Sequence, residues 1–346
     1  MGRHASLAFL LVAVLVVALA FAAPLFVPRR GIQDLFFILT LLVLAQCWNL
    51  LAGYAGLVSV GQQAFVGLGA YAMVGSVVQL GLDPLAGIAV GGLCAVLLAI
   101  PTGYFVFRLQ GAYFAIGTWV IAEVVRLALA QFKALGGGTG TSLPAPVMRD
   151  MWGVGLVSKL FGVRSAQAVD ILCYWLAVML AVGSIVFIYK LLRSRQGLGL
   201  AAVRDNQQAA RAVGVNALRI RSAVYLISAL ITGVTGALIY VQKAHISPDA
   251  AFSVTDWTAY VIFIVVIGGI GTVEGPIIGV IVLYILQALL ADYGSWYLLG
   301  LGLVGICVML FAPRGLWGLV TERTGIQLFP VRRTLTGGPI TTPGRT

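Results

Sequence analysis

Long apolar runs dominate this chain and limit its possible folds more than any other feature. The first extends from Leu7 to Val27, and runs of similar length recur along the sequence. A helix needs about 20 apolar residues to cross a hydrocarbon layer of roughly 30 Å. Only 10% of the residues are charged, against about 25% in soluble domains. Because the runs do not alternate as barrel strands do, we predict an all-α, polytopic helical membrane protein.

Breaks in hydropathy at Gly, Pro and charged residues predict about ten transmembrane helices. The first follows Arg3 and is too long for a typical signal peptide, so we interpret it as a retained span. We expect one transmembrane domain over 1–320 and a disordered tail over 321–346. The predicted spans are 7–27, 35–52, 57–79, 85–107, 112–131, 168–189, 222–242, 257–273, 275–291 and 295–312.

Lysine and arginine in the short loops predict the orientation, because cytoplasmic loops carry an excess of both. With a cytoplasmic N-terminus, fourteen face the cytoplasm: Arg3, Arg108, Lys190, Arg193, Arg195, Arg204, Arg211, Arg219, Arg221, Arg314, Arg323, Arg332, Arg333 and Arg345. Seven face outward: Arg29, Arg30, Lys133, Arg149, Lys159, Arg164 and Lys243. The net charge of +11 therefore reflects topology, and no nucleic acid partner is implied.

Two soluble segments connect the spans. Residues 132–167 form an external loop that contains "MWGVGLVSKLFGV", a candidate short helix at the membrane interface with Trp152 as its anchor. Residues 190–221 form a cytoplasmic loop. The four cysteines are scattered singly, and with only His4 and His245 no metal site is predicted. No catalytic set is visible within the spans, so we do not expect an enzyme.

The polar stretch "AAVRDNQQAARAVGVN", residues 201–216, stands out in this apolar chain. On one helix, Arg204, Gln207, Gln208 and Arg211 would share a face, with Asp205 beside them. Ala202, Asn206, Ala209 and Val213 would form the opposite face, and Gly214 would end the helix. The pattern fits a helix that docks into a partner's groove, and it equally fits a solvated basic loop.

"QAARAVG", Gln208 to Gly214, resembles the EAA loop of ABC importer permeases, with Gln in place of Glu and without the later Ile-x-Leu-Pro. The wider stretch is similar to the loop of LivM-type permeases of branched-chain amino-acid importers. Further segments that resemble this family in order are "NLLAGYAGLVSVGQQAFVGLGAYA", "GAYFAIGTWVIAEVVRLAL", "ISPD", "VIGGIGTVEGPIIG" and "FAPRGLWG". The resemblance covers about residues 30–318, although the external loop has "GGTGT" where many members have a run like Gly-Gly-Thr-Asp-Gly.

The resemblance implies a permease subunit in the bacterial inner membrane, with both termini cytoplasmic, that imports branched-chain or other hydrophobic amino acids. Its implied partners are a homologous LivH-type permease, an external solute-binding protein and two cytoplasmic ABC ATPases that bind ATP and Mg. This chain has no G-x-x-x-x-G-K-[ST] loop, so we expect it to bind no cofactor itself. The implied ATPase-coupling residues are Arg204, Asp205, Gln207, Gln208, Ala209, Ala210, Arg211 and Gly214.

Glycine clusters predict helix breaks, which transporters place at their pathways. One contains Gly53, Gly56 and Gly61 and the other Gly268, Gly271 and Gly275, in comparable positions of the two halves. With five spans in each half, repeated halves would be inverted in the membrane, which we state as a hypothesis. Helix packing alone would explain them equally well. Glu274, in "GTVEGP", is expected at a solvated or gating turn on the cytoplasmic side.

Polar groups inside spans complete the set of candidate pathway residues. Amides near the first break could bind the charged ends of an amino acid or hold neighbouring helices together. Glu123 and Arg126 could pair on one helix face, where a bridge that locks helices is favoured over substrate contact. The candidates are Asn49, Gly53, Ser59, Gln62, Gln63, Glu123, Arg126, Gly268 and Gly271. Alternatives are a permease for urea or small amides and acids, or an ion-coupled secondary transporter.

Overall fold

The computed structural model describes residues 3–290, 294, 296–325 and 328–329, and within them the chain is almost entirely helical. The helices of the first half are α1 (Arg3–Ala22), α2 (Arg29–Asn49), α3 (Gln62–Leu80), α4 (Pro84–Val106) and α5 (Ala112–Ala130). Then follow α6 (Ala145–Asp150), α7 (Val154–Phe161), α8 (Ser165–Arg193), α9 (Arg195–Asp205), α10 (Gln207–Ala212) and α11 (Ala217–Lys243). The last are α12 (Pro248–Ala251), α13 (Tyr260–Gly268), α14 (Gly275–Leu290), α15 (Trp296–Phe311) and α16 (Gly315–Thr324).

Strand structure in the described residues is limited to one small antiparallel pair. β1 (Thr141–Ser142) lies beside β2 (His245–Ile246), with Thr141 opposite Ile246. His245 sits in this pair, where its Nδ1 lies 2.9 Å from the Ser142 hydroxyl. The fold is therefore that of an all-α polytopic protein.

Each of the ten predicted spans coincides with an apolar helix of the structure. Eight helical segments in the described residues are long and apolar enough to cross a membrane, and two apolar helices are shorter, Val12–Leu25 and Gly275–Leu290. Several predicted ends differ from the structure, and the second helix begins at Arg29 rather than near residue 35. The third helix begins at Gln62 rather than near residue 57, and the eighth span ends at Gly268 rather than 273.

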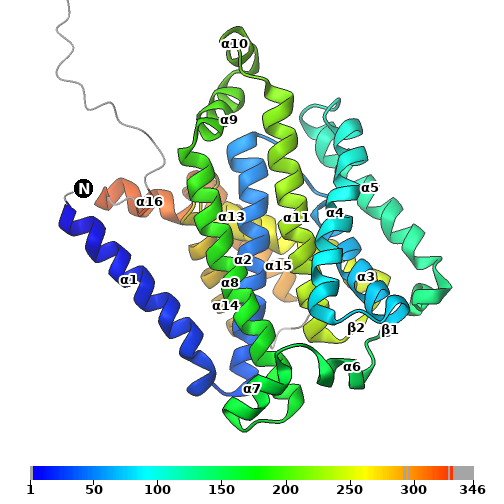
Figure 1. The fold of residues 1–346 in the computed structure, drawn as a ribbon. Helices are drawn as coiled ribbons and strands as arrows, with labels where there is room; N and C mark the ends of the chain where they lie inside the picture. Colours follow the sequence, from blue (N-terminus) through cyan, green and yellow to red (C-terminus); the bar gives the residue numbers. More distant parts are fainter. Residues whose placement is uncertain (1–2, 291–293, 295, 326–327, 330–346) are drawn as a thin grey trace, which may run out of the picture.

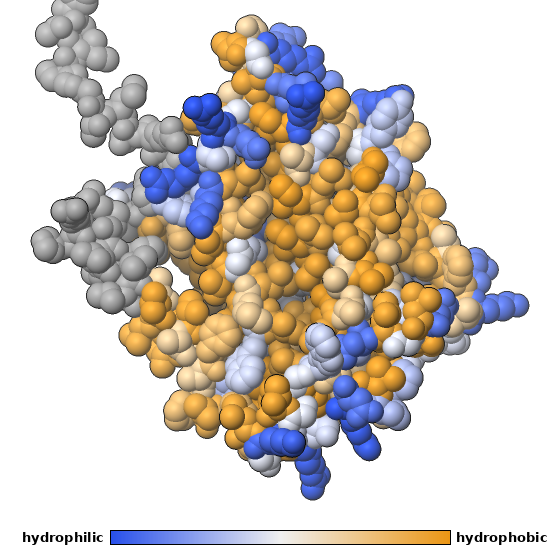
Figure 2. Space-filling model, in the orientation of Figure 1, coloured by the Kyte–Doolittle hydropathy of each residue, from blue (hydrophilic) through white to orange (hydrophobic). Residues whose placement is uncertain are grey.

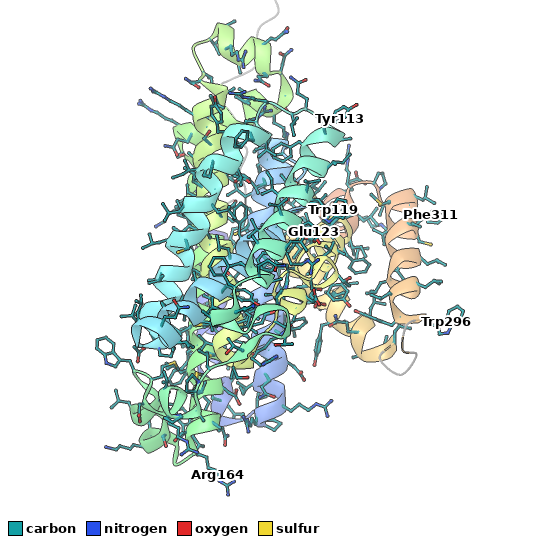
Figure 3. The ribbon with its side chains drawn as sticks, turned by 90° about the vertical axis from the view of Figure 1, so that its right-hand side faces the viewer. Tyr113, Trp119, Glu123, Arg164, Trp296 and Phe311 are labelled. Carbon is teal, nitrogen blue, oxygen red and sulfur yellow. The ribbon has the colours of Figure 1, made fainter. Side chains whose placement is uncertain are left out.

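The core of the bundle lies around α2, α3 and α11 (Figure 1). Most of the apolar length of these helices is buried, and Trp48, Tyr71 and Tyr240 are among their large enclosed side chains. By contrast, α5 and α15 leave most of their apolar side chains exposed. In Figure 3, α15 stands apart from the main bundle, with Trp296 and Phe311 projecting from it.

Polar residues gather at the two ends of the molecule, with an apolar band between them (Figure 2). We name these the α10 end and the α7 end after the helices that mark them in Figure 1. The α7 end holds the segment 132–167, in which the predicted short helix is present as α7, preceded by exposed Trp152. The predicted start of the tail is wrong, because α16 continues to Thr324. The rest of the predicted disorder, 330–346, lies outside the described residues.

Candidate functional site

The first helix break follows α2. The helix continues through a π-helical turn, Leu50–Tyr54, and residues 56–61 are not helical before α3 begins at Gln62. π-Helical turns are rare and often occur at functional sites. The predicted break at this glycine cluster is therefore confirmed.

The second break separates α13 from α14. Gly269 and Gly271 adopt positive φ angles of 132° and 75°, which side-chain-bearing residues rarely adopt. The two helices then pack so closely that a Cβ on Gly268 would collide with the carbonyl of Gly275. The glycines here serve the break and the tight packing at once.

The two breaks contact each other directly, although more than 200 residues separate them in sequence. Asn49 donates from Nδ2 to the Thr272 carbonyl at 2.7 Å and accepts at Oδ1 from the Gly271 amide at 2.8 Å. Gln46 adds a bond from Nε2 to the Val273 carbonyl at 2.8 Å. A Cβ on Gly53 would lie 2.6 Å from the Gly271 nitrogen, so only glycine fits. Side-chain amides thus satisfy the backbone groups that the second break frees.

The other predicted polar residues near the first break are buried and bind several different neighbours. Gln62 donates to the Leu44 carbonyl at 3.0 Å and to Thr232 of α11 at 3.2 Å. Gln63 accepts from the Thr258 hydroxyl, and the Ser59 carbonyl accepts from the Trp48 indole. These residues tie α3 to helices on several sides, and their contact with a substrate stays a prediction.

The prediction of one continuous helix over the polar stretch is wrong. α9 ends at Asp205, and Asn206 adopts an extended conformation with φ −155° and ψ 106° before α10 begins at Gln207. Its Oδ1 accepts from the amides of Gln208 and Ala209, both at 3.0 Å. Asparagine is a favoured N-cap because its short side chain can bind these free amides. Arg204 and Arg211 therefore belong to different helices and share no face.

The predicted small-residue face is also wrong. Ala209 and Val213 are exposed, and the buried contacts are made by Val203 of α9 and Ala210 of α10 with Ala217 of α11. Arg221 of α11 donates to the Gln207 Oε1 at 3.0 Å, which adds a second attachment. Gly214 does end the segment, with φ at 83°. α10 is thus fixed to α9 and α11 while Gln208 and Arg211 remain exposed.

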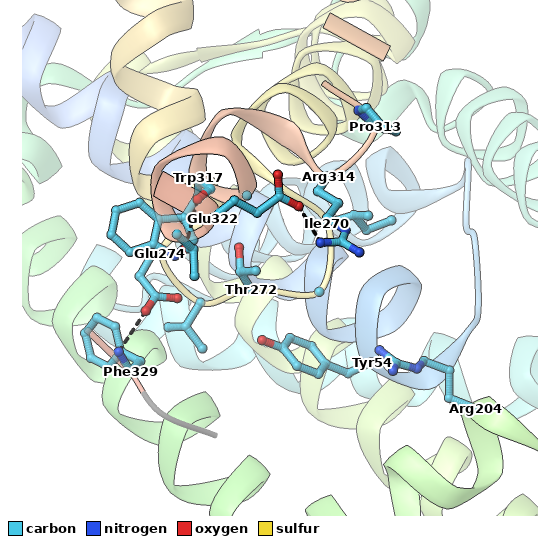
Figure 4. A pocket seen from close by; sticks show the side chains of 14 residues that line it. Tyr54, Arg204, Ile270, Thr272, Glu274, Pro313, Arg314, Trp317, Glu322 and Phe329 are labelled. Atoms are coloured by element: carbon cyan, nitrogen blue, oxygen red, sulfur yellow. Dashed lines mark hydrogen bonds and ion pairs between the residues drawn. The ribbon is translucent and has the colours of Figure 1, made fainter. Parts of the chain in front are cut away.

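Arg204 points inward to the first break. Its Nη1 donates to the Gly53 carbonyl at 2.9 Å, and its Nε lies 3.3 Å from Asp205. Arg204 also lines a cavity of about 580 Å³ together with Tyr54, Thr272 and Glu274 (Figure 4). The polar segment is therefore in direct contact with the interlocked breaks, which the sequence did not show.

Glu274 is enclosed, so its expected solvation is wrong. The residue is 5% exposed, and its Oε1 accepts from the Phe329 amide at 2.7 Å. It lies at the turn into α14, as predicted, and lines the same cavity as Arg204 (Figure 4).

Glu123 and Arg126 form the expected pair on α5, and Arg126 also bridges to another helix. Its Nε and Nη2 bind the Glu123 carboxylate at 2.5 to 3.1 Å, and its Nη1 binds Asp249 of α12 at 2.6 Å. Side-chain exposures are 25% for Arg126, 41% for Glu123 and 83% for Asp249. Figure 3 shows Glu123 on the same side of the molecule as Tyr113 and Trp119 of α5. The predicted bridge between helices is present, with Asp249 as the partner that sequence reasoning missed.

Nothing in the described residues gathers three or more His, Cys, Asp or Glu side chains that could hold a metal ion. Cys47 and Cys173 are buried, and Cys307 is exposed. What distinguishes the candidate site is a pair of helix breaks that buried side-chain amides hold together within a helical bundle.

An apolar helical bundle with two interlocked helix breaks is typical of a multi-pass membrane transport protein. Over residues 32–312 the chain matches the family described as branched-chain amino acid transport system, permease component, and it belongs to that family. The family consists of transport components rather than enzymes.

Curated relatives agree with the family. The chain is 29% identical over 317 residues to the high-affinity branched-chain amino acid transport system permease protein LivM of Escherichia coli, which covers 88% of this chain and 74% of the relative. LivM of Salmonella typhimurium is 28% identical with the same coverage. A probable LivM of Methanocaldococcus jannaschii is 24% identical over 257 residues, 68% of this chain and 70% of the relative. No solved structure matched the chain.

Proposed function

We propose that this chain is the permease subunit of an ABC importer that moves branched-chain or other hydrophobic amino acids into the cytoplasm. The family and the names of the curated relatives support the substrate class. The observation that carries the mechanism is the hydrogen bond from Arg204 of α9 to the Gly53 carbonyl. It connects a helix at the α10 end with the interlocked breaks.

The α10 end faces the cytoplasm in this proposal, and both termini lie on that side of the bacterial inner membrane. The excess of Lys and Arg predicted for the inside supports this orientation. The helices α9 and α10 project at this end (Figure 1), where a cytoplasmic partner would meet them.

Two cytoplasmic ATPase subunits that bind ATP and Mg dock on α10 through exposed Gln208 and Arg211. Because Ala210 packs against Val203 and Ala217, and Gln207 binds Arg221, a displacement of α10 is passed to α9 and α11. Arg204 then transmits it to Gly53. In this scheme Arg204 is a positioning residue between the motor and the breaks rather than an ATPase contact.

The translocation pathway runs beside the breaks and along the face of α5 that carries Glu123. An ionisable group exposed to hydrocarbon costs about 3 kcal/mol at the membrane centre. Since α5 leaves Glu123 and Arg126 partly exposed, this face is expected to meet water or a partner subunit rather than lipid. A homologous LivH-type permease would cover it, and an external solute-binding protein would deliver substrate at the α7 end.

The test uses the assembled transporter, reconstituted with its ATPase subunits and binding protein. Arg204→Ala should leave the ATPase subunits bound and lower leucine uptake by at least about tenfold, because a hydrogen bond to a charged group contributes about 1.5–3 kcal/mol. The double variant Gln208→Ala/Arg211→Ala should instead weaken co-purification of the ATPase subunits. Arg195→Ala, an exposed arginine at the same end, should change neither quantity. Uptake that continued without any ATPase subunit would refute the proposal.

A further inference from the structure

A second cavity, of about 670 Å³, opens at the α10 end between α4, α10 and α11. It is distinct from the cavity beside Glu274, and the transport scheme above places no ligand in it. Three arginines from three elements line it: Arg108 after α4, Arg211 in α10 and Arg221 in α11. No Asp or Glu is present among the described residues of its wall. A cavity with this lining has an uncompensated positive charge.

The three guanidinium groups keep hydrogen-bonding capacity for a ligand. Within the described residues none of them forms an ion pair with a carboxylate. Arg221 donates from Nη1 to Gln207, while its buried Nε has no partner in the described part of the chain. Arg108 stacks on the ring of Tyr104, with its Cζ 4.3 Å from the ring centroid. Arginine is suited to phosphate groups because its planar donors can bind two oxygens at once.

An exposed apolar stripe leads along α4 to this cavity. Leu93, Leu97, Ile100 and Tyr104 follow one another at helical spacing, and each is more than half exposed. Ile100 and Tyr104 also belong to the cavity wall, as does Leu226 of α11. The stripe therefore continues from the apolar band of the molecule to the arginines. A ligand that fills both parts has an anionic head and a long apolar tail.

We propose that this cavity binds the phosphate headgroup of an anionic phospholipid, whose acyl chain lies along the exposed stripe of α4. Attraction to the membrane surface contributes about 1 kcal/mol for each Lys or Arg. An acidic segment of a partner protein would satisfy the arginines and leave the stripe unused, so the lipid is the better fit. Because Gln207 and Arg211 belong to α10, a bound lipid braces this helix against α4 and α11. The binding itself does not depend on the transport function proposed above.

The assembled transporter, purified in detergent and examined by native mass spectrometry, provides the test. Dioleoylphosphatidylglycerol should remain bound, whereas dioleoylphosphatidylcholine should not. Glycerol phosphate, which has the headgroup chemistry without a tail, should fail to displace it. Arg108→Gln/Arg221→Gln leaves the proposed docking residues in place and should lower retention of phosphatidylglycerol by roughly 30-fold, since two arginines are lost. The control Arg195→Gln/Arg219→Gln removes two charges at the same end from residues outside this cavity, and retention should not change.

A second measurement on the unmodified chain keeps the proposal falsifiable if the double variant does not fold. Phosphatidylglycerol with a photoreactive acyl chain should label residues 93–104 of α4 in the assembled transporter. The proposal is overturned if phosphatidylcholine is retained equally, if the control variant loses as much lipid, or if glycerol phosphate displaces the lipid. It is also overturned if phosphatidylglycerol binds only after the ATPase subunits are removed, because a protein partner would then fill the cavity.

Discussion

At Gly53 the two helix breaks lie in direct contact. Its carbonyl accepts from Arg204, and its missing side chain leaves room for the backbone of Gly271. Asn49, one turn earlier, bonds both the Gly271 amide and the Thr272 carbonyl. The turn from Asn49 to Gly53, at the end of α2, therefore contacts the second break and accepts the hydrogen bond from Arg204 of α9.

Gly53→Ala should destabilise the assembled transporter and lower leucine uptake, because the new Cβ would lie 2.6 Å from the Gly271 nitrogen. Overpacking of this kind costs about 1–3 kcal/mol. Thermal unfolding and uptake in proteoliposomes are the measurements. Gly183→Ala in α8 is the control, because a Cβ there meets nothing within 4 Å. Equal behaviour of the two variants would contradict the close approach of the breaks.

The sequence identified Asn49 and Gly53 as candidates and left their partners unknown. An amide within an apolar run is costly in lipid unless its polar atoms are bonded, and glycine allows a helix to break. Their partners lie 222 and 223 residues away for Asn49 and 151 residues away for Gly53. Local pattern carries no information on such distances. The burial of Glu274 was missed for the same reason, because Phe329 covers it from 55 residues further on.

At the scale of elements, the division between α9 and α10 depends on the cap at Asn206. Helical periodicity placed Asn206 inside a helix, but its side chain competes for backbone amides and favours a helix start. The exposed residues of the polar stretch were predicted well at Gln208 and Arg211. Arg204 was assigned to the same face only because the interruption was not recognised.

Asn206→Ala should loosen α10 while leaving the transmembrane helices intact. The variant removes the acceptor for the Gln208 and Ala209 amides, which costs about 0.5–2 kcal/mol of helix stability. Hydrogen exchange should become faster over residues 207–212. Asn206→Asp keeps an acceptor oxygen and should exchange as the unmodified chain does. Unchanged exchange in the alanine variant would show that packing of Ala210, rather than the cap, holds α10.

The bridge from α5 to α12 should matter more for transport than for stability. Asp249→Asn breaks an exposed ion pair, and such pairs contribute about 0–1 kcal/mol. If the Glu123 face of α5 borders the pathway, leucine uptake should fall clearly while the unfolding temperature changes little. Asp150→Asn, which alters an exposed acid at the same end, should affect neither. A loss of stability as large as the loss of uptake would favour a purely structural bridge.

For the whole molecule, hydropathy predicted the helical elements well, because the bilayer imposes length and apolarity on every crossing. Two apolar helices, Val12–Leu25 and Gly275–Leu290, are shorter than the eight candidate spans, so helix length alone does not identify them as membrane crossings. α14 begins at a break inside the bundle, so its length follows the break rather than the bilayer. The proposed inverted relation of the two halves stays a prediction, since contact between the breaks does not require it.

The transport proposals depend on orientation, because ATPase docking requires α10 to face the cytoplasm. Polar segments cap both ends of the bundle (Figure 2), so shape alone leaves two orientations. The excess of Lys and Arg in the loops predicted to face inward favours the orientation with the α10 end in the cytoplasm. Cytoplasmic loops carry more of both residues than external loops do. The choice can be tested on two exposed residues, Gln208 in α10 and Lys159 in α7.

In a background with its four cysteines replaced, Lys159→Cys should react with a membrane-impermeant maleimide added to intact cells. Gln208→Cys should react only in inside-out vesicles or after permeabilisation. Retained leucine uptake by Lys159→Cys, and measurable uptake by Gln208→Cys, would establish that the labelled chains are assembled. External labelling at Gln208→Cys would place α10 away from ATP, and the role of Arg204 as a link to the ATPase subunits would then be excluded. The lipid site would survive that result, because an anionic headgroup is available to arginines on either side of a membrane.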